Sequence, residues 1–270
     1  MAEVAIVASA FGAGVIRRDG HATWLEVAKA GGAHAFEVRR ELMDDADASL
    51  DALRSLGTAF ANAQMWSVWS TPDSLYAEDG ALDASALREA VACAQALGAR
   101  FVKLQLGGFA GDAHAAHLAD VLAELGAKAA KATTNVVASE TRLPRVVVEN
   151  GQLEMGGRLA QFTGLFRALR ASGHDGLLGM TFDIGNWQWT GEAPLMAAVA
   201  LAPHVEYIHC KAVQGEGARR FPCAPAADDP LCRAALARLP SDVPRGIEFP
   251  FDETRLADDA ARYVSWLGAA

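Results

Sequence analysis

The sequence has little cysteine and no strongly basic segment. Its 270 residues include four cysteines, and no two of them form a CxxC pair. This spacing argues against a structural zinc site and against the disulfide framework of small secreted domains, so we expect reduced thiols. The formal net charge is −9 and no tract of lysine and arginine occurs, so nucleic acid is an unfavourable partner. A small-molecule partner is favoured instead.

The sequence also lacks long hydrophobic runs. The apolar stretch from Val4 to Ile16 covers 13 residues, which is too short to span a bilayer. Glu3 precedes it and two arginines, Arg17 and Arg18, follow it, which is the reverse of the charge order in a signal peptide. These features predict a cytoplasmic protein that does not use a membrane as a partner.

Sequence motifs of two large enzyme classes are missing. The chain contains no Gly-Lys-Ser/Thr phosphate loop and no Gly-x-Ser-x-Gly nucleophile elbow. The short segment from Gly12 to Gly14 lacks the third glycine of a dinucleotide-binding fingerprint. Nucleotide-binding and serine-hydrolase functions are therefore disfavoured.

What the sequence does contain is a regular alternation of two kinds of segment. Eight short segments rich in β-branched or aromatic residues alternate with alanine- and leucine-rich segments of helical periodicity, which is typical of a parallel sheet wound with helices. The predicted strands are Val4 to Ser9, Ala35 to Arg39, Thr58 to Ala63, Phe101 to Leu106, Arg145 to Glu149, Met180 to Asp183, Val205 to His209 and Arg245 to Phe249. The predicted helices are Ala22 to Ala30, Ser49 to Leu56, Ser85 to Leu97, Ala113 to Lys131, Leu159 to Ser172, Pro194 to Leu201, Asp229 to Arg238 and Leu256 to Leu267.

Eight strands are the number that an α/β (β/α)8 TIM barrel requires. The chain is 51% hydrophobic and has the length of one such barrel, so residues 1–270 are expected to form a single TIM-barrel domain. The segment from Gln214 to Asp229 is rich in glycine, proline and charge, and it is expected to be a long loop at the barrel mouth.

Four successive predicted strands end in a side chain that can bind a metal, namely Glu149, Asp183, His209 and Glu248. Their spacings of 34, 26 and 39 residues are each about one βα unit, so the four side chains should converge at the C-terminal mouth of the barrel. Buried carboxylates gathered at one point repel one another unless a cation compensates them. We therefore predict that these four residues bind one divalent metal ion.

The ligand set also predicts a reaction. Three carboxylates and one imidazole form a hard, oxygen-rich set that favours Mn²⁺, with Mg²⁺, Co²⁺ or Zn²⁺ as alternatives. Such a metal polarises a carbonyl and its neighbouring hydroxyl and stabilises an enediolate, while Glu149 and Glu248 act as an acid–base pair. This is the chemistry of isomerases and epimerases.

Several further residues are candidates for substrate binding, namely Arg39, Gln152, Arg158, Asn186, Trp187, Lys211 and Arg219. Lys211 follows His209 by two residues, and Arg158 lies near a predicted helix start, so both are placed to hold an anion. Four of the candidates have a second interpretation. Arg39 suits an interior ion pair with Glu37, and Trp187 suits the hydrophobic core. Arg158 suits a solvated helix position, and Arg219 suits a soluble loop.

At these residues the chain resembles the xylose isomerase-like TIM-barrel superfamily of sugar phosphate isomerases and epimerases. The matching segments are Phe36 to Arg39, Val148 to Asn150, Phe182 to Asn186, Ile208 to Lys211, and Ile247 with Glu248. The segments Glu149 to Gln152, Met180 to Trp187 and His209 to Val213 are most similar to proteins of bacterial 2-ketogluconate utilisation. The resemblance implies the same four metal ligands, the same acid–base pair and a homodimer.

The chain departs from two branches of this superfamily. Ketose 3-epimerases place a substrate-binding histidine where this chain has Asn186, so their substrate specificity does not transfer directly. The multi-zinc endonuclease branch needs further histidines at the ends of strands 3 and 4 and after the strand 6 aspartate. They are missing here, because neither Ala63 to Trp66 nor Leu104 to Gly107 contains histidine.

The sequence thus predicts a metal-dependent isomerase or epimerase of a keto sugar or keto sugar acid, such as 2-ketogluconate or its phosphate. A dehydratase, that is a lyase of a keto-polyol or keto acid, remains an alternative because both reactions begin with proton abstraction α to a carbonyl. A sugar-binding barrel without turnover is a second alternative.

Overall fold

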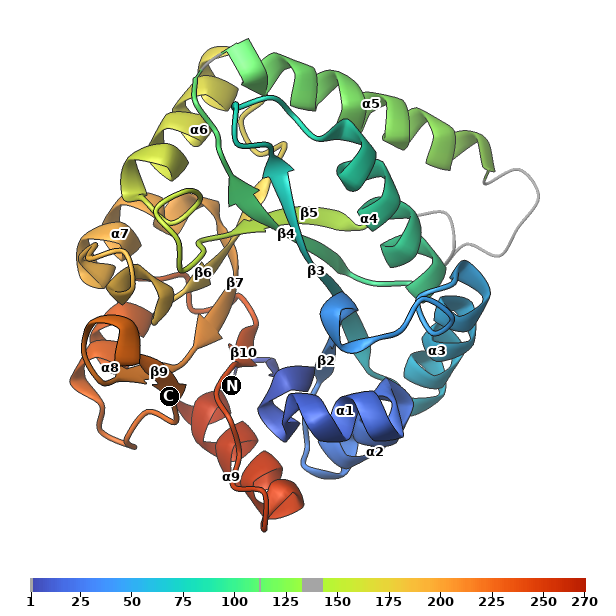
Figure 1. Ribbon diagram of the computed structural model, residues 1–270, viewed down its shortest axis with the longest axis vertical. Helices are drawn as coiled ribbons and strands as arrows, with labels where there is room; N and C mark the ends of the chain where they lie inside the picture. Colours follow the sequence, from blue (N-terminus) through green and yellow to red (C-terminus); the bar gives the residue numbers. More distant parts are fainter. Residues whose placement is uncertain (1, 112, 133–142) are drawn as a thin grey trace.

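The computed structural model describes residues 2–111, 113–132 and 143–270, and within them eight parallel strands close into a barrel (Figure 1). The order around the barrel is β1, β10, β7, β6, β5, β4, β3, β2. The strands are β1 (Val4–Val7), β2 (Ala35–Arg39), β3 (Trp66–Tyr76), β4 (Phe101–Gly107), β5 (Arg145–Glu149), β6 (Gly179–Asp183), β7 (Val205–Cys210) and β10 (Arg245–Ile247). The predicted α/β barrel is confirmed.

Helices surround the ring of strands on the outside (Figure 1). They are α1 (Ala13–Asp19), α2 (His21–Ala30), α3 (Leu50–Ala63), α4 (Ala84–Leu97), α5 (Ala113–Ala132), α6 (Leu159–Ala171), α7 (Pro194–Leu201), α8 (Pro230–Leu236) and α9 (Leu256–Ala269). The prediction missed α1, which follows β1 directly through a short 3-10 turn. None of the helices in the described residues is long and apolar enough to cross a membrane.

The predicted third strand is wrong. Residues 58–63 continue helix α3, and the strand begins three residues later, at Trp66. The buried residues of α3 are Leu53, Leu56, Phe60 and Ala63, which recur at helical spacing. Gln64 then ends the helix in the left-handed conformation, with φ 56°.

The segment from Gln214 to Asp229, predicted as a loop, contains a strand. Phe221–Cys223 forms β9, which pairs in antiparallel fashion with β8 (Ala212–Gln214) just beyond β7. A two-stranded ribbon therefore stands next to the end of β7. Asp229 closes the segment by accepting a hydrogen bond from the backbone of Cys232 at the start of α8.

The barrel has two hydrophobic layers. A small inner cluster fills the N-terminal end of the barrel and consists of Ala5, Ala35, Val68, Phe101, Val147 and Tyr207. The larger outer cluster lies between the strands and the helices and includes the alternate residues of the same strands, such as Phe36 and Val38 on β2. Because the inner cluster fills one end, the polar side chains that point inward gather at the other end.

Candidate functional site

Strand pairing brings the four predicted metal ligands to the same level of the barrel. Asp183 at the end of β6 pairs with His209 on β7. Glu149 at the end of β5 pairs with Thr181, which precedes Asp183 by two residues on β6. Glu248 follows β10, where its backbone N–H donates to the carbonyl of Cys210 at 3.2 Å. All four side chains are buried or nearly so, and their ligand atoms lie within 4.8 Å of one another.

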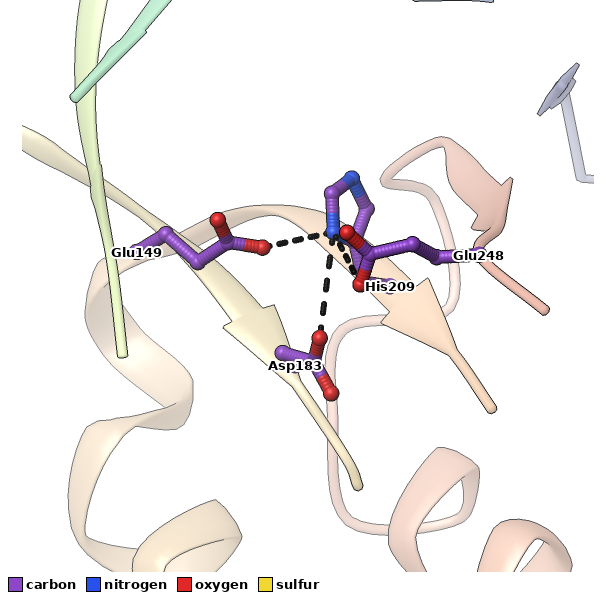
Figure 2. A group of neighbouring side chains, drawn as sticks. All are labelled: Glu149, Asp183, His209 and Glu248. Carbon is purple, nitrogen blue, oxygen red and sulfur yellow. Dashed lines mark ion pairs between the residues drawn. The ribbon is translucent and has the colours of Figure 1, made fainter. Parts of the chain in front are cut away.

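The imidazole of His209 is the centre of this group (Figure 2). Its Nδ1 lies 2.6 Å from Oε1 of Glu149, 3.2 Å from Oε2 of Glu248 and 4.0 Å from Oδ2 of Asp183. Glu149 and Glu248 approach it from opposite sides, and Asp183 approaches from between them (Figure 2). One ring nitrogen thus faces three carboxylates.

The other ring nitrogen of His209 is held by a buried carboxylate. Nε2 lies 2.8 Å from Oε2 of Glu37, a fully buried residue on β2. Glu37 in turn contacts Lys103, whose Nζ lies 3.0 Å from Oε1. A carboxylate in this place fixes the orientation of a ligating imidazole.

Lys103 also holds Glu149. Its Nζ donates to Oε2 of Glu149 at 2.7 Å, and Nε2 of Gln105 donates to the same oxygen at 2.9 Å. Both donors come from inward-facing positions of β4, and Lys103 is fully buried. Oε2 of Glu149 is therefore occupied by the protein, whereas Oε1 is turned toward His209.

Asp183 is held from its own loop and from the neighbouring strand. Its Oδ1 accepts backbone hydrogen bonds from Gly185 at 2.8 Å and Asn186 at 2.9 Å. The side chain of Asn150 bridges the backbone of Asp183, donating to its carbonyl and accepting from its N–H. Asn186 donates to the carbonyl of Asn150 at 2.7 Å and accepts from Gln152 at 3.2 Å.

Two cations flank Glu248 at the mouth. Nη1 of Arg39 lies 2.9 Å from Oε1 of Glu248, and Nζ of Lys211 lies 2.7 Å from Oε2. Lys211 also lies 2.6 Å from Oδ2 of Asp183. Arg39 pairs in addition with Glu41 at the rim, at 2.6 Å. The predicted substrate-binding residues Arg39 and Lys211 are thus both beside the candidate ligands.

A glycine makes room for the imidazole. A Cβ on Gly246 of β10 would lie 2.4 Å from the hydroxyl of Tyr207 and 2.9 Å from Cδ2 of His209. The Tyr207 ring packs edge-on against His209, with 4.8 Å between ring centroids. Tyr207 and Gly246 together form the floor beneath His209.

The pKa values of the carboxylates differ strongly within the group. Burial raises the pKa of Asp183 to about 8, because the nearby carboxylates add to the effect of burial and outweigh the ammonium of Lys211. Burial also opposes ionisation of Glu149, but Lys103 and His209 outweigh it and lower its pKa to about 2. The pKa of Glu248 lies well below its usual range because Lys211 and His209 outweigh burial.

His209 responds to the same group of charges. Burial and Lys103 lower its pKa, but the carboxylates of Glu37, Glu248 and Glu149 outweigh them and raise it well above the usual range. A raised pKa on both Asp183 and His209 means that the group retains protons that positive charge would displace. This property suits a divalent cation, whose binding releases protons from its ligands.

The missing hydrogen bonds of three ligand atoms also indicate a cation site. Oε1 of Glu149, Oδ2 of Asp183 and Nδ1 of His209 are buried, and none has hydrogen-bond geometry to a partner in the described residues. Their contacts are ion pairs, Oε1 with Nδ1 at 2.6 Å and Oδ2 with Lys211 at 2.6 Å, so the convergence of these atoms on one point is suited to a cation. A divalent metal held by Glu149, Asp183, His209 and Glu248 fits this donor set.

Other predicted substrate-binding residues lie away from this point. Trp187 is fully buried against Phe162 and Phe182, so the second interpretation holds and it belongs to the hydrophobic core, not to a substrate-binding surface. Arg158 donates to the carbonyl of Thr190 at 2.7 Å and pairs with a glutamate of its own loop.

The loop arginines differ from each other. Arg219 is exposed in the turn between β8 and β9. Its neighbour Arg220 donates to the carbonyl of Gln188, which ties the ribbon to the β6 loop. Neither contacts the four candidate ligands in the described residues.

The sequence did not predict roles in the site for Lys103, Gln105 and Asn150. Lys103 and Gln105 share the inward side of β4 with Phe101, and a lysine within an otherwise apolar strand is the signal that could have identified them. Glu37 does more than pair with Arg39. Its carboxylate lies 2.8 Å from His209 but 3.6 Å from Arg39, so His209 is the closer partner.

Known proteins resemble this chain in sequence pattern and in fold. A model of the xylose isomerase-like TIM barrel family matches residues 25–264. D-psicose 3-epimerase, crystallised in the presence of D-fructose, superimposes with a TM-score of 0.61 at 10% identity, over 98% of this chain and 97% of that chain. The probable 3-DHS dehydratase AsbF from Bacillus anthracis does so with a TM-score of 0.60 at 12% identity, over 98% of both chains.

A third structure of the same fold contains a metal. The IOLI protein with a bound zinc atom has a TM-score of 0.64 at 14% identity, over 97% of this chain and 96% of that chain. No curated protein sequence matches the chain significantly. At identities this low, the three structures show a shared fold.

Proposed function

The chain belongs to the xylose isomerase-like TIM barrel family, and we propose that it is a divalent-metal-dependent isomerase or epimerase of a keto sugar or keto sugar acid. One observation carries this proposal. Glu149 and Glu248 enter the mouth from opposite sides of His209, and both belong to the group that could hold a metal (Figure 2). Two carboxylates on opposite sides of one point suit removal and return of a proton on opposite faces of a substrate.

The four candidate ligands would hold the metal, and Mn²⁺ is the ion that we propose for this set. A bound metal supplies Lewis-acid polarisation of a substrate carbonyl, which makes the adjacent C–H more acidic. The protein residues supply the rest. Glu37 fixes the ring of His209, while Lys103 and Gln105 hold the far oxygen of Glu149.

Proton transfer is assigned to Glu149 and Glu248. The pKa of each is lowered, so both are ionised near neutral pH and either can accept a proton from carbon. Lys103 beside Glu149, and Arg39 with Lys211 beside Glu248, stabilise these ionised forms.

The positive charges at the mouth support an anionic substrate. Arg39 and Lys211 are both partly or fully desolvated and both lie beside Glu248, where a carboxylate or phosphate of the substrate would be near them. A keto sugar acid such as 2-ketogluconate, or its phosphate, has this chemistry. We place Gln152 and Asn186, which are joined by a hydrogen bond, as the polar contacts for substrate hydroxyls.

A dehydratase is the second candidate function. The same two glutamates would expel a β-hydroxyl if one of them protonated it after the α-proton had been removed. The proton-accepting group is the same in both reactions, so the fate of the substrate separates them. A barrel that binds a sugar without turnover would not need two carboxylates on opposite sides of one point.

Proton-exchange NMR in D₂O tests the proposal. The substrates are 2-ketogluconate, its phosphate and neutral ketohexoses, each with and without Mn²⁺. We expect Mn²⁺-dependent deuterium uptake at a carbon α to the carbonyl, with an epimer or isomer as product. A dehydrated product would instead establish the lyase, and binding without deuterium uptake for every substrate would contradict the proposal.

A further inference from the structure

The ammonium of Lys211 contacts oxygens that also face the metal-binding point. Nζ lies 2.6 Å from Oδ2 of Asp183 and 2.7 Å from Oε2 of Glu248. The same two oxygens face Nδ1 of His209, at 4.0 Å and 3.2 Å. Lys211 is 4% exposed, so solvent does little to weaken these contacts. Two of the four candidate ligand atoms are therefore shared between Lys211 and any metal.

The other two cations of the site contact different oxygens. Lys103 binds Oε2 of Glu149, whereas Oε1 is the oxygen that faces His209. Arg39 binds Oε1 of Glu248, whereas Oε2 is the one that faces His209. Lys103 and Arg39 thus contact the carboxylate oxygens that do not face His209. Among the cations that contact these ligands in the described residues, Lys211 is the one on the metal-facing side.

We propose that Lys211 is an internal competitor of the metal ion for Asp183 and Glu248. A metal that binds both oxygens must displace the ammonium from them, because two cations on the same carboxylate oxygens repel each other in a site that excludes water. The site therefore binds its metal less tightly than its four ligands alone would. This inference rests on the metal site of the proposed function and is independent of the sugar that is turned over.

The surroundings of Lys211 allow its ammonium to move while its stem stays in place. The stem packs on the backbone of Gly185, where a Cβ would lie 2.6 Å from Cγ of Lys211. The ammonium has a second partner in the ring of Trp189, with 5.8 Å from Nζ to the centroid. A hollow of about 100 Å³ also adjoins the side chain and is lined in part by Gln188 and Asp229. A displaced ammonium thus has room and alternative partners.

The affinity for Mn²⁺ tests this inference. Free Mn²⁺ is measured by electron paramagnetic resonance during titration of the wild type and of Lys211→Met, whose side chain has a similar length without the charge. We expect Lys211→Met to bind Mn²⁺ at least about tenfold more tightly than the wild type. Lys211→Arg, which keeps a cation, should stay within about threefold of the wild type.

Arg39→Met is the matched control, because it removes the same charge from the other oxygen of Glu248. It should change the affinity by less than about threefold if the shared oxygens are the cause. Equal tightening in Arg39→Met and Lys211→Met, or no tightening in Lys211→Met, overturns the inference. Absence of Mn²⁺ binding in every variant overturns it together with the metal site.

Two further outcomes are distinguishable. If Lys211→Met folds only with Mn²⁺, a chelator should unfold it while the wild type stays folded, which supports the inference. Tighter Mn²⁺ binding by Lys211→Met, together with no deuterium exchange by the wild type on any sugar, supports the inference and contradicts the proposed function.

Discussion

Oε2 of Glu37 lies 2.8 Å from Nε2 of His209, and both residues are fully buried. The contact fixes the plane of the imidazole, so that Nδ1 points at Glu149, Asp183 and Glu248 (Figure 2). An acidic residue on β2 therefore orients a candidate ligand on β7, although the two are 172 residues apart.

Replacing Glu37 should weaken metal binding without removing a ligand. In Glu37→Gln the imidazole loses its charged partner, and we expect the Mn²⁺ affinity to fall about 10- to 100-fold, as measured by titration with Mn²⁺. Glu41→Gln is the control, because the partner of Glu41 within the described residues is Arg39 at the rim and not His209. Equal losses in both variants would show that general charge, and not orientation, is responsible.

Replacing either acid–base residue should eliminate turnover and leave the fold intact. We expect Glu149→Gln and Glu248→Gln to lose at least about 100-fold in kcat at saturating Mn²⁺, because an amide does not accept the proton. The assay is deuterium exchange and product formation, with circular dichroism as the check on folding. Glu124→Gln on the surface of α5 is the control. Unchanged turnover in both active-site variants would refute the assigned roles.

A methyl group on Gly246 should disturb the floor of the site. The added Cβ would lie 2.4 Å from the Tyr207 hydroxyl and 2.9 Å from the His209 ring. We expect Gly246→Ala to lose about 1–3 kcal/mol of stability in urea unfolding and to bind Mn²⁺ more weakly. Gly126→Ala in helix α5, where an added Cβ meets nothing within 4 Å, should instead gain up to about 1 kcal/mol. Similar stability of the two variants would contradict this account.

His21 should make the barrel less stable in mild acid. Burial lowers its pKa to about 4, and Nε2 accepts a hydrogen bond from the backbone N–H of Arg39 at 3.2 Å, which requires a neutral ring. The unfolded chain takes up a proton near pH 6.5 and the folded chain does not, so this contribution is complete above about pH 6.5 and is lost as the pH falls toward 4.

When the pH is lowered from about 7.5 to about 5, the protonation of His21 in the unfolded chain should reduce the free energy of unfolding by about 2 kcal/mol. Urea unfolding at the two pH values should therefore show a smaller acid loss in His21→Gln than in the wild type. An identical loss in both proteins would show that His21 does not carry this pH dependence.

The barrel and the four candidate ligands could be predicted because their signals are local. Each ligand stands at the end of a short apolar strand, and one βα unit separates it from the next. The boundary between α3 and β3 could not be placed as well. Phe60 and Ala63 suit a buried strand as well as a buried helix face, and periodicity over six residues does not separate the two.

The partners of the ligands depend on contacts across the barrel. Lys103 meets Glu37 and Glu149 only when β2, β4 and β5 lie in the observed register. Trp187 adjoins the Asp183 loop in the sequence, yet the 3-10 turn of Asn186–Gln188 carries its ring into the core. Which way such a side chain points is decided by tertiary packing and not by its sequence neighbours.

The stoichiometry of metal binding is the most direct test of a metal site formed by Glu149, Asp183, His209 and Glu248. The protein is dialysed to equilibrium against Mn²⁺ and its metal content is measured, with Asp183→Ala as the control that removes one ligand. We expect one Mn²⁺ per chain in the wild type and much weaker binding in Asp183→Ala. A wild type that binds no divalent metal, or an Asp183→Ala variant that binds it equally well, would contradict this metal site.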